Sequence, residues 1–240
     1  MPQSKIQNLK SKILLAWSVH LYTAMGLVAA AVMAVLIFEG GDDNFRVALL
    51  LMILATVIDS TDGILARRAQ VTKWTPGFDG RRLDDITDFH TYTSLPLLFI
   101  WRIGILPGAL SWWLLAPLLA SGYGFSQSDA KTKDGYFLGF PSYWNALAFY
   151  FYFLRPSPGI AIAFLVILAL LTFVPLRYLY PLYGGRFGKL TIVLGVVWGV
   201  LLVLIASGTI EDRRTMVWTS VAFPTYYLLT SWWISLRRGK

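Results

Sequence analysis

The chain has 240 residues, of which 56% are hydrophobic and 15% are aromatic, and its mean hydropathy is +0.59. Soluble domains are roughly 45–50% apolar and about 25% charged, so this composition excludes an ordinary soluble domain and predicts an integral membrane protein. The formal charge of +8 does not indicate a nucleic-acid partner, because the basic residues stand in short gaps between apolar runs. With no cysteine, the chain forms neither disulfides nor thiolate metal sites.

Apolar runs of about 20 residues, the length that spans a bilayer, follow one another along the chain. The first comes after a basic segment at residues 4–12 and is too long for a signal-peptide core, so we expect a retained helix. The predicted spans lie near residues 13–38, 45–66, 84–102, 105–124, 137–155, 158–178, 188–208 and 214–236.

The predicted fold class is therefore an all-α polytopic membrane protein with about eight transmembrane helices. The hairpins near residues 101–110 and 154–160 are short, which leaves open six helices with re-entrant segments. No internal repeat or linker divides the chain, so residues 1–240 are expected to form a single domain.

Eight crossings would place both termini on the same side of the membrane. Basic residues collect in cytoplasmic loops, so their distribution gives the orientation. Of the 21 Lys and Arg residues, sixteen fall on the side of the termini, and five fall on the other side: Arg46, Arg102, Arg155, Arg213 and Arg214. Both termini are therefore predicted to be cytoplasmic.

Two pairs of acids interrupt the apolar pattern. Asp59 and Asp62 stand near the cytoplasmic end of the second predicted helix, and Asp84 and Asp88 stand at the start of the third. Spacings of three and four put both members of a pair on one helical face, so the two faces can converge on one site. Carboxylate ligands without His or Cys favour hard cations such as Mg²⁺ or Mn²⁺.

Other roles for these acids remain open at this point. The second pair lies at a helix N-terminus, where carboxylates complement the helix dipole without any ligand. Asp59 and Asp62 could instead pair with the arginines that follow them, Arg67 and Arg68. A charged side chain within a membrane helix is costly, however, and usually functional, which favours a cation site for the first pair.

Small residues accompany the acids on the second helix. Gly63 and Ala66 leave a shallow trough, and Arg67 closes it with a planar donor fork suited to phosphate. Small residues also ease the packing of membrane helices, so this feature alone does not identify a ligand site.

These residues together resemble the CDP-alcohol phosphotransferase family, whose signature is D-x2-D-G-x2-A-R followed by G-x3-D-x3-D. All eight fixed positions of that signature are present in this sequence: Asp59, Asp62, Gly63, Ala66, Arg67, Gly80, Asp84 and Asp88. The resemblance implies that Asp59, Asp62 and Asp84 are metal ligands. It implies that Asp88 shares the metal site and acts as the general base. It also implies that four further positions line the nucleotide site: Gly63, Ala66, Arg67 and Gly80.

The twelve-residue spacer after Arg67, the tract DGRRLDDITDF at residues 79–89 and the tract TKDGYFLGFPSYWN at residues 132–145 resemble the bacterial phosphatidylcholine synthase branch of that family. The resemblance implies that CDP-diacylglycerol and choline are the substrates and that phosphatidylcholine and CMP are the products. It further implies Mn²⁺ or Mg²⁺ as cofactor, with two ions expected, a homodimer, and a place in the bacterial cytoplasmic (inner) membrane.

Choline carries a permanent positive charge, so its pocket should contain aromatic faces. Trp and Tyr also gather at membrane interfaces without any ligand, which is the competing explanation for each candidate. The candidate choline contacts are His20, Tyr22, Tyr123, Tyr143 and Trp144.

Two further residues are candidate phosphate contacts. Thr23 follows His20 at the spacing at which many family members carry Asn and Thr in the first helix, with His20 here replacing the Asn. Lys131 follows the fourth predicted helix, where it could bind phosphate, pair with a neighbouring acid or mark the cytoplasmic side.

Two other functions compete with this reading. Serine, inositol or glycerol phosphate could replace choline as the acceptor in the same reaction. A divalent-cation transporter could use the same four acids, but the acids lie near one face of the membrane and the two halves of the chain do not repeat.

Overall fold

The computed structural model describes residues 3–128, 132, 135–180 and 185–238. The first half of the chain is helical throughout. It comprises α1 (Gln3–Glu39), α2 (Asp42–Ala69), α3 (Val71–Trp74), α4 (Gly80–Asp88), the π-helix η1 (Phe89–Ser94), α5 (Leu95–Arg102), the 3₁₀ helix η2 (Gly108–Leu114) and α6 (Leu115–Ser126).

The second half adds one short antiparallel ribbon to further helices. Its elements are β1 (Tyr136–Leu138), α7 (Trp144–Leu154), α8 (Pro158–Phe173), β2 (Arg177–Leu179), α9 (Gly185–Ser207), α10 (Arg213–Ser220) and α11 (Ala222–Arg238). Strands β1 and β2 pair with Tyr136 opposite Leu179 and Leu138 opposite Arg177. Apart from this ribbon the described fold is all-α, as predicted.

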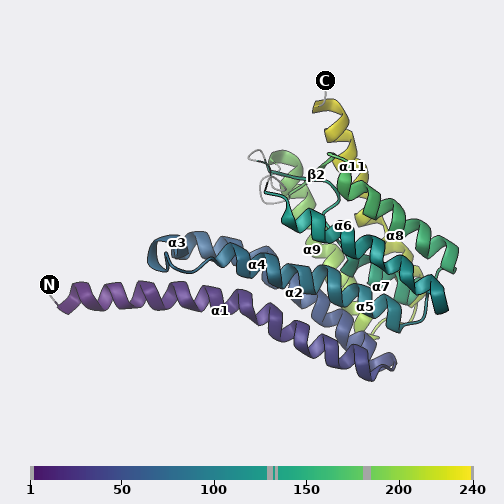
Figure 1. The fold of residues 1–240 in the computed structure, drawn as a ribbon, viewed down its shortest axis with the longest axis horizontal. Helices are drawn as coiled ribbons and strands as arrows, with labels where there is room; N and C mark the ends of the chain where they lie inside the picture. Colours follow the sequence, from purple (N-terminus) through teal and green to yellow (C-terminus); the bar gives the residue numbers. More distant parts are fainter. Residues whose placement is uncertain (1–2, 129–131, 133–134, 181–184, 239–240) are drawn as a thin grey trace.

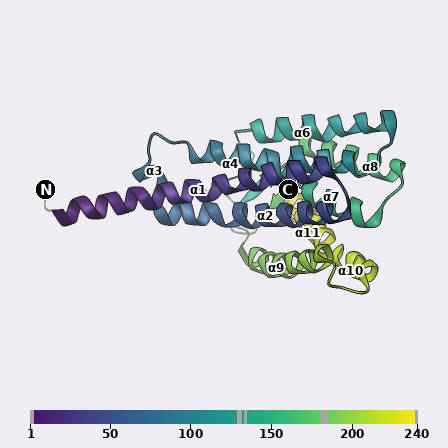
Figure 2. The same ribbon diagram turned by 90° about the horizontal axis from the view of Figure 1, so that it is seen from below.

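Helix α1, helix α2 and the continuous helix formed by α4, η1 and α5 run side by side along the long axis of the molecule (Figures 1 and 2). Helices α6 and α8 pack together on one side of this group, and α9 packs against α2 on the other side (Figure 2). Helix α11 lies against β2 near the C-terminus (Figure 1). In this arrangement α1 packs against both α2 and α4, and α2 also contacts η1.

Three helices in the described part of the chain are long and apolar enough to cross a membrane: Gln7–Glu39, Asp42–Ala69 and Phe187–Ser207. Helix α1 extends for about 55 Å at 1.5 Å per residue, well beyond the roughly 30 Å of a hydrocarbon core. Apolar side chains on the outside of the helices are widely exposed, as a lipid-facing surface requires; Phe38, for example, is 85% exposed. The total of eight crossings stays a prediction.

The structure corrects the predicted span at residues 137–155, because this range is not one helix. Strand β1 occupies its beginning, and α7 has only 11 residues, about 17 Å, which is too short to cross a bilayer alone. Gly139 explains the break: its φ is +80°, and a Cβ there would lie 2.3 Å from the carbonyl oxygen of Thr172. The span predicted at residues 158–178 likewise ends early, at Phe173, because Val174 precedes Pro175 and is disfavoured in helical conformation.

Two other predicted spans are divided. The range 105–124 begins with the 3₁₀ helix η2 after Pro107, and the range 214–236 divides at Val221 into α10 and α11.

The helix predicted at 84–102 is continuous from residue 80 to residue 102, but it contains η1. Pro96 has no N–H for the carbonyl four residues earlier, and Leu95 instead donates to His90 five residues before it, which widens the helix here.

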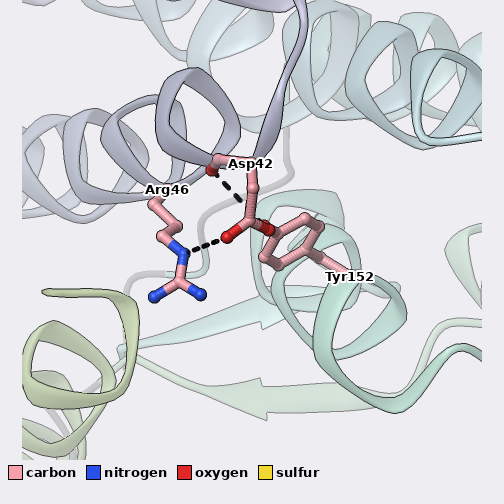
Figure 3. A network of polar contacts seen from close by, with 3 residues as sticks. All are labelled: Asp42, Arg46 and Tyr152. Atoms are coloured by element: carbon pink, nitrogen blue, oxygen red, sulfur yellow. Dashed lines mark hydrogen bonds and ion pairs between the residues drawn. The ribbon is translucent and has the colours of Figure 1, made fainter. Parts of the chain in front are cut away.

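A polar network fixes the end of α2 that lies away from the acids. Arg46 Nε donates to Asp42 Oδ2 at 2.7 Å, and the Tyr152 hydroxyl of α7 donates to the other carboxylate oxygen (Figure 3). The guanidinium of Arg46 lies against Gly208, where a Cβ would be 2.8 Å from Nη1. This network ties α2 to α7 and to the turn after α9, and so fixes the helix that carries Asp59.

Candidate active site

Three aspartates from two helices converge in the structure. Asp59 of α2 and Asp84 and Asp88 of α4 each offer one carboxylate oxygen, and these oxygens lie within 4.8 Å of one another. All three residues are partly buried. Three carboxylates held this close suit a hard divalent cation. The donor set therefore fits the metal that the sequence predicts.

The fourth predicted ligand, Asp62, lies outside this group of three and faces α1. Asp62 is only 6% exposed, and its Oδ2 accepts a hydrogen bond of 2.9 Å from Thr23 Oγ1 of α1. It is not part of the group of three. Three residues along a helix are a rotation of about 300°, so when Asp59 faces α4, Asp62 is turned about 60° away, toward α1. Thr23 therefore contacts a predicted metal ligand.

Tyr92 is a site residue that the sequence reasoning missed. Its hydroxyl donates to Asp59 Oδ2 at 2.8 Å, and the residue is 6% exposed. Tyr92 lies in η1, where the π-helical turn changes which side chains face α2. Such turns recur at functional sites. Pro96, four residues later, is the signal that could have indicated a broken helix at this position.

The candidate nucleotide residues of α2 border a hollow. A cavity of about 490 Å³ lies at the C-terminal end of α2 and is lined by Ala66, Arg67, Gln70, Val71, Thr72 and Lys73. Gly63 lies one turn before Ala66, and a Cβ on it would meet only Arg67 Nη1, at 3.4 Å. The trough predicted from the small residues therefore lies beside an open cavity. Lys131, the other predicted phosphate contact, lies outside the described residues.

Gly80 has a different neighbour from the other candidate nucleotide residues. A Cβ on Gly80 would lie 2.7 Å from Cε1 of His20. His20 is 5% exposed and contacts the loop before α4, where its Nε2 lies 2.9 Å from Thr75 Oγ1 and its ring lies 4.5 Å from the ring of Phe78. The structure thus brings two predicted residues, His20 and Gly80, into direct contact with each other.

Tyr143 is the aromatic candidate that the structure brings toward the acids. Its ring lies 6.3 Å from that of Tyr92, which contacts Asp59, and 5.9 Å from that of Tyr227 in α11. Tyr22 lies on α1, and its hydroxyl shares a 2.8 Å hydrogen bond with Thr61 of α2.

The other two aromatic candidates lie elsewhere. Trp144 is fully buried, and its indole N–H donates to Ser121 Oγ at 2.7 Å, so it packs the core between α7 and α6. Tyr123 is 45% exposed, packs on Phe173 at 4.8 Å and lines a second cavity of about 480 Å³ between α6 and the β ribbon.

Comparisons with known proteins agree with the motif. The model of the CDP-alcohol phosphatidyltransferase family matches residues 19–174, a range that includes all four aspartates. The phosphatidylcholine synthase of Pseudomonas aeruginosa is 34% identical over 228 residues, 92% of each chain. That of Borreliella burgdorferi is 32% identical over 80% of this chain and 81% of its own, and that of Legionella bozemanae is 35% identical over 78% and 89%.

Proposed function

Because the chain belongs to the CDP-alcohol phosphatidyltransferase family, we propose that it is a phosphatidylcholine synthase, which transfers the phosphatidyl group of CDP-diacylglycerol to choline and releases CMP. The observation that carries the proposal is the convergence of Asp59, Asp84 and Asp88 from two helices that pack under α1. Three carboxylates held together in an apolar bundle are suited to a divalent cation and, through it, to a diphosphate.

Asp59, Asp84 and Asp88 would hold the metal, and Asp62, one turn along α2, would contribute to a second ion. We propose Mn²⁺ or Mg²⁺ in this role and two ions in total. When bound, such cations neutralise the diphosphate charge and stabilise the leaving phosphate. The chain orients the ligands: Tyr92 holds the carboxylate of Asp59, and Thr23 holds that of Asp62.

Asp88 is the proposed general base. The choline oxygen forms a bond to the phosphorus that carries diacylglycerol, the anhydride bond to the CMP phosphate breaks, and Asp88 accepts the hydroxyl proton. A hydroxyl is a poor nucleophile until it loses that proton, so a positioned carboxylate is required. The cavity beside Ala66 and Arg67 offers space and a guanidinium for the nucleotide phosphates.

For the acceptor, Tyr143 is the aromatic candidate best placed to contact the choline ammonium, because its neighbour Tyr92 contacts Asp59. An aromatic face attracts a quaternary ammonium and offers no preference for an anionic acceptor such as glycerol phosphate. His20, Tyr22, Tyr123 and Trp144 have partners in the packing that support structural roles.

The finer topology belongs to the same proposal. An even number of crossings with both termini in the cytoplasm, a single domain over residues 1–240, the bacterial inner membrane and a homodimer are proposed from the distribution of basic residues and from the family resemblance. Diacylglycerol would then stay in lipid while the cytidine reaches the cytoplasmic end of α2.

The test is purified protein in detergent with CDP-diacylglycerol, Mn²⁺ and one alcohol at a time, scored for CMP and for labelled lipid. We expect CMP release with choline and the formation of phosphatidylcholine. Incorporation of serine, inositol or glycerol phosphate but not choline would refute the assignment of choline as the acceptor. Metal uptake into proteoliposomes without CMP release would instead support a cation transporter.

A further inference from the structure

Helix α1 carries none of the three convergent aspartates, yet it touches α4 at two places where there is no spare room. At one, a Cβ on Gly80 would lie 2.7 Å from the imidazole of His20. At the other, a Cβ on Gly26 of α1 would lie 2.4 Å from Cγ2 of Thr87. Real Cβ atoms essentially never come within 3.0 Å of another heavy atom, so an alanine at either position would force the facing side chain of His20 or Thr87 to move.

These two contacts bracket the catalytic acids of α4. Gly80 precedes Asp84 by about one helical turn, and Thr87 directly precedes Asp88. Because the helix is held at both positions, its distance from α1 and its rotation about its own axis are both fixed. Those two quantities decide whether Asp84 and Asp88 face Asp59.

His20 also holds the loop that leads into α4. Thr75 Oγ1 donates to the carbonyl of Val71 at 2.8 Å, and a hydroxyl has a single hydrogen. In its 2.9 Å contact with His20 Nε2, Thr75 therefore accepts, and the imidazole carries its proton on Nε2. The ring of Phe78 packs on the same imidazole at 4.5 Å. Two loop residues and Gly80 thus meet at one side chain of α1.

We propose that His20 is a positioning residue: it anchors the loop at residues 75–79 and the start of α4 on α1, and so holds Asp84 and Asp88 at Asp59. It follows that Gly80 is glycine in this chain because the imidazole fills the space of its side chain, and not because a nucleotide needs that space. The activity readout of this inference rests on the proposed function, whereas its metal-binding readout does not.

The first experiment is a compensation test on purified protein. Manganese affinity is measured by the loss of the free Mn²⁺ electron paramagnetic resonance signal, and the rate of CMP release is measured against CDP-diacylglycerol concentration. We expect Gly80→Ala to weaken manganese binding at least tenfold and to lower kcat by about a hundredfold, the size of effect that follows a misplacement of about 1 Å. His20→Ala combined with Gly80→Ala should return both quantities to those of His20→Ala alone.

The opposite result is equally clear. If the double variant is as impaired as Gly80→Ala, and if the defect is a raised KM for CDP-diacylglycerol with unchanged manganese affinity, the glycine serves the nucleotide and the proposal is overturned. Wild-type protein that binds manganese but releases no CMP with choline would refute the proposed function and leave the positioning test intact.

A conservative variant separates positioning from packing alone. In His20→Gln the amide N–H can reach Thr75 as the imidazole Nε2–H does. We expect it to retain manganese affinity within about threefold of wild type, while His20→Ala loses at least fivefold. Equal affinities in the two variants would overturn the role of the hydrogen bond, and this comparison decides the matter even if Gly80→Ala does not fold.

The second close contact provides a matched control at a glycine that is not among the candidate nucleotide residues. Gly26→Ala is expected to weaken manganese binding as Gly80→Ala does, and Thr87→Ser, which removes the clashing methyl, is expected to relieve it. Full manganese affinity in well-folded Gly26→Ala would show that α1 does not position α4.

Discussion

Replacement of Thr23 by Val tests how α1 supports the acids. The substitution keeps the shape of the side chain and removes the hydroxyl that donates to Asp62 Oδ2 at 2.9 Å. The two residues are 7% and 6% exposed, so water does not replace the lost donor. A hydrogen bond to a charged group contributes about 1.5–3 kcal/mol. At about 1.36 kcal/mol per factor of ten, activity at limiting Mn²⁺ should fall by about 10- to 150-fold.

The assay is CMP release over a manganese titration, with Thr23→Ser as the matched control. Serine keeps the hydroxyl, so we expect it to stay within about threefold of wild type. In an Asp62→Asn background, Thr23→Val should add little further loss, because the charged acceptor is already gone. If Thr23→Val retains activity within twofold of Thr23→Ser, or loses the same factor when Asp62 is absent, the hydrogen bond does not orient a metal ligand.

Three further predictions concern the proposed base Asp88, the partner of Asp59 and the packing of the β ribbon. Asp88→Asn is expected to abolish turnover while nucleotide binding stays measurable by calorimetry; full activity would exclude Asp88 as the base. Tyr92→Phe removes the donor to Asp59, a proposed metal ligand, and should raise the Mn²⁺ concentration for half-maximal rate by about tenfold; an unchanged titration would contradict its role. Gly139→Ala, which would place a Cβ 2.3 Å from the Thr172 carbonyl oxygen, should lower the thermal unfolding temperature markedly, whereas Gly122→Ala, with open space around it, should not; equal melting would refute this packing argument.

Much of the helical architecture could be predicted because long apolar runs indicate membrane helices directly. The predicted limits failed where local backbone chemistry overrides hydropathy. The apolar segments next to Gly139 and Pro175 were predicted to be helical, but they form the β ribbon. Gly139 has a positive φ, and Pro175 disfavours helical conformation at Val174. Hydropathy cannot distinguish the two, since a buried strand and a buried helix are equally apolar.

The acids were predictable as a group because spacings of three and four define a helical face. Which of the four acids come together in space could not be predicted. The sequence places Asp59 and Asp62 on one face, but the positions of α1 and α4 relative to α2 decide that only Asp59 joins the acids of α4, while Asp62 meets Thr23 of α1. Tyr92 was missed for a similar reason, because the π turn that aims it at Asp59 depends on how the helix rearranges before Pro96.

The central claim is that Asp59, Asp84 and Asp88 together hold the divalent cation of a phosphatidyl transfer. The most direct measurement is anomalous X-ray scattering at the manganese absorption edge from crystals grown with Mn²⁺ and CMP. The account predicts a manganese peak between these three carboxylates, about 2.1 Å from their oxygens. A peak elsewhere in the protein, with none among the three aspartates, would contradict it.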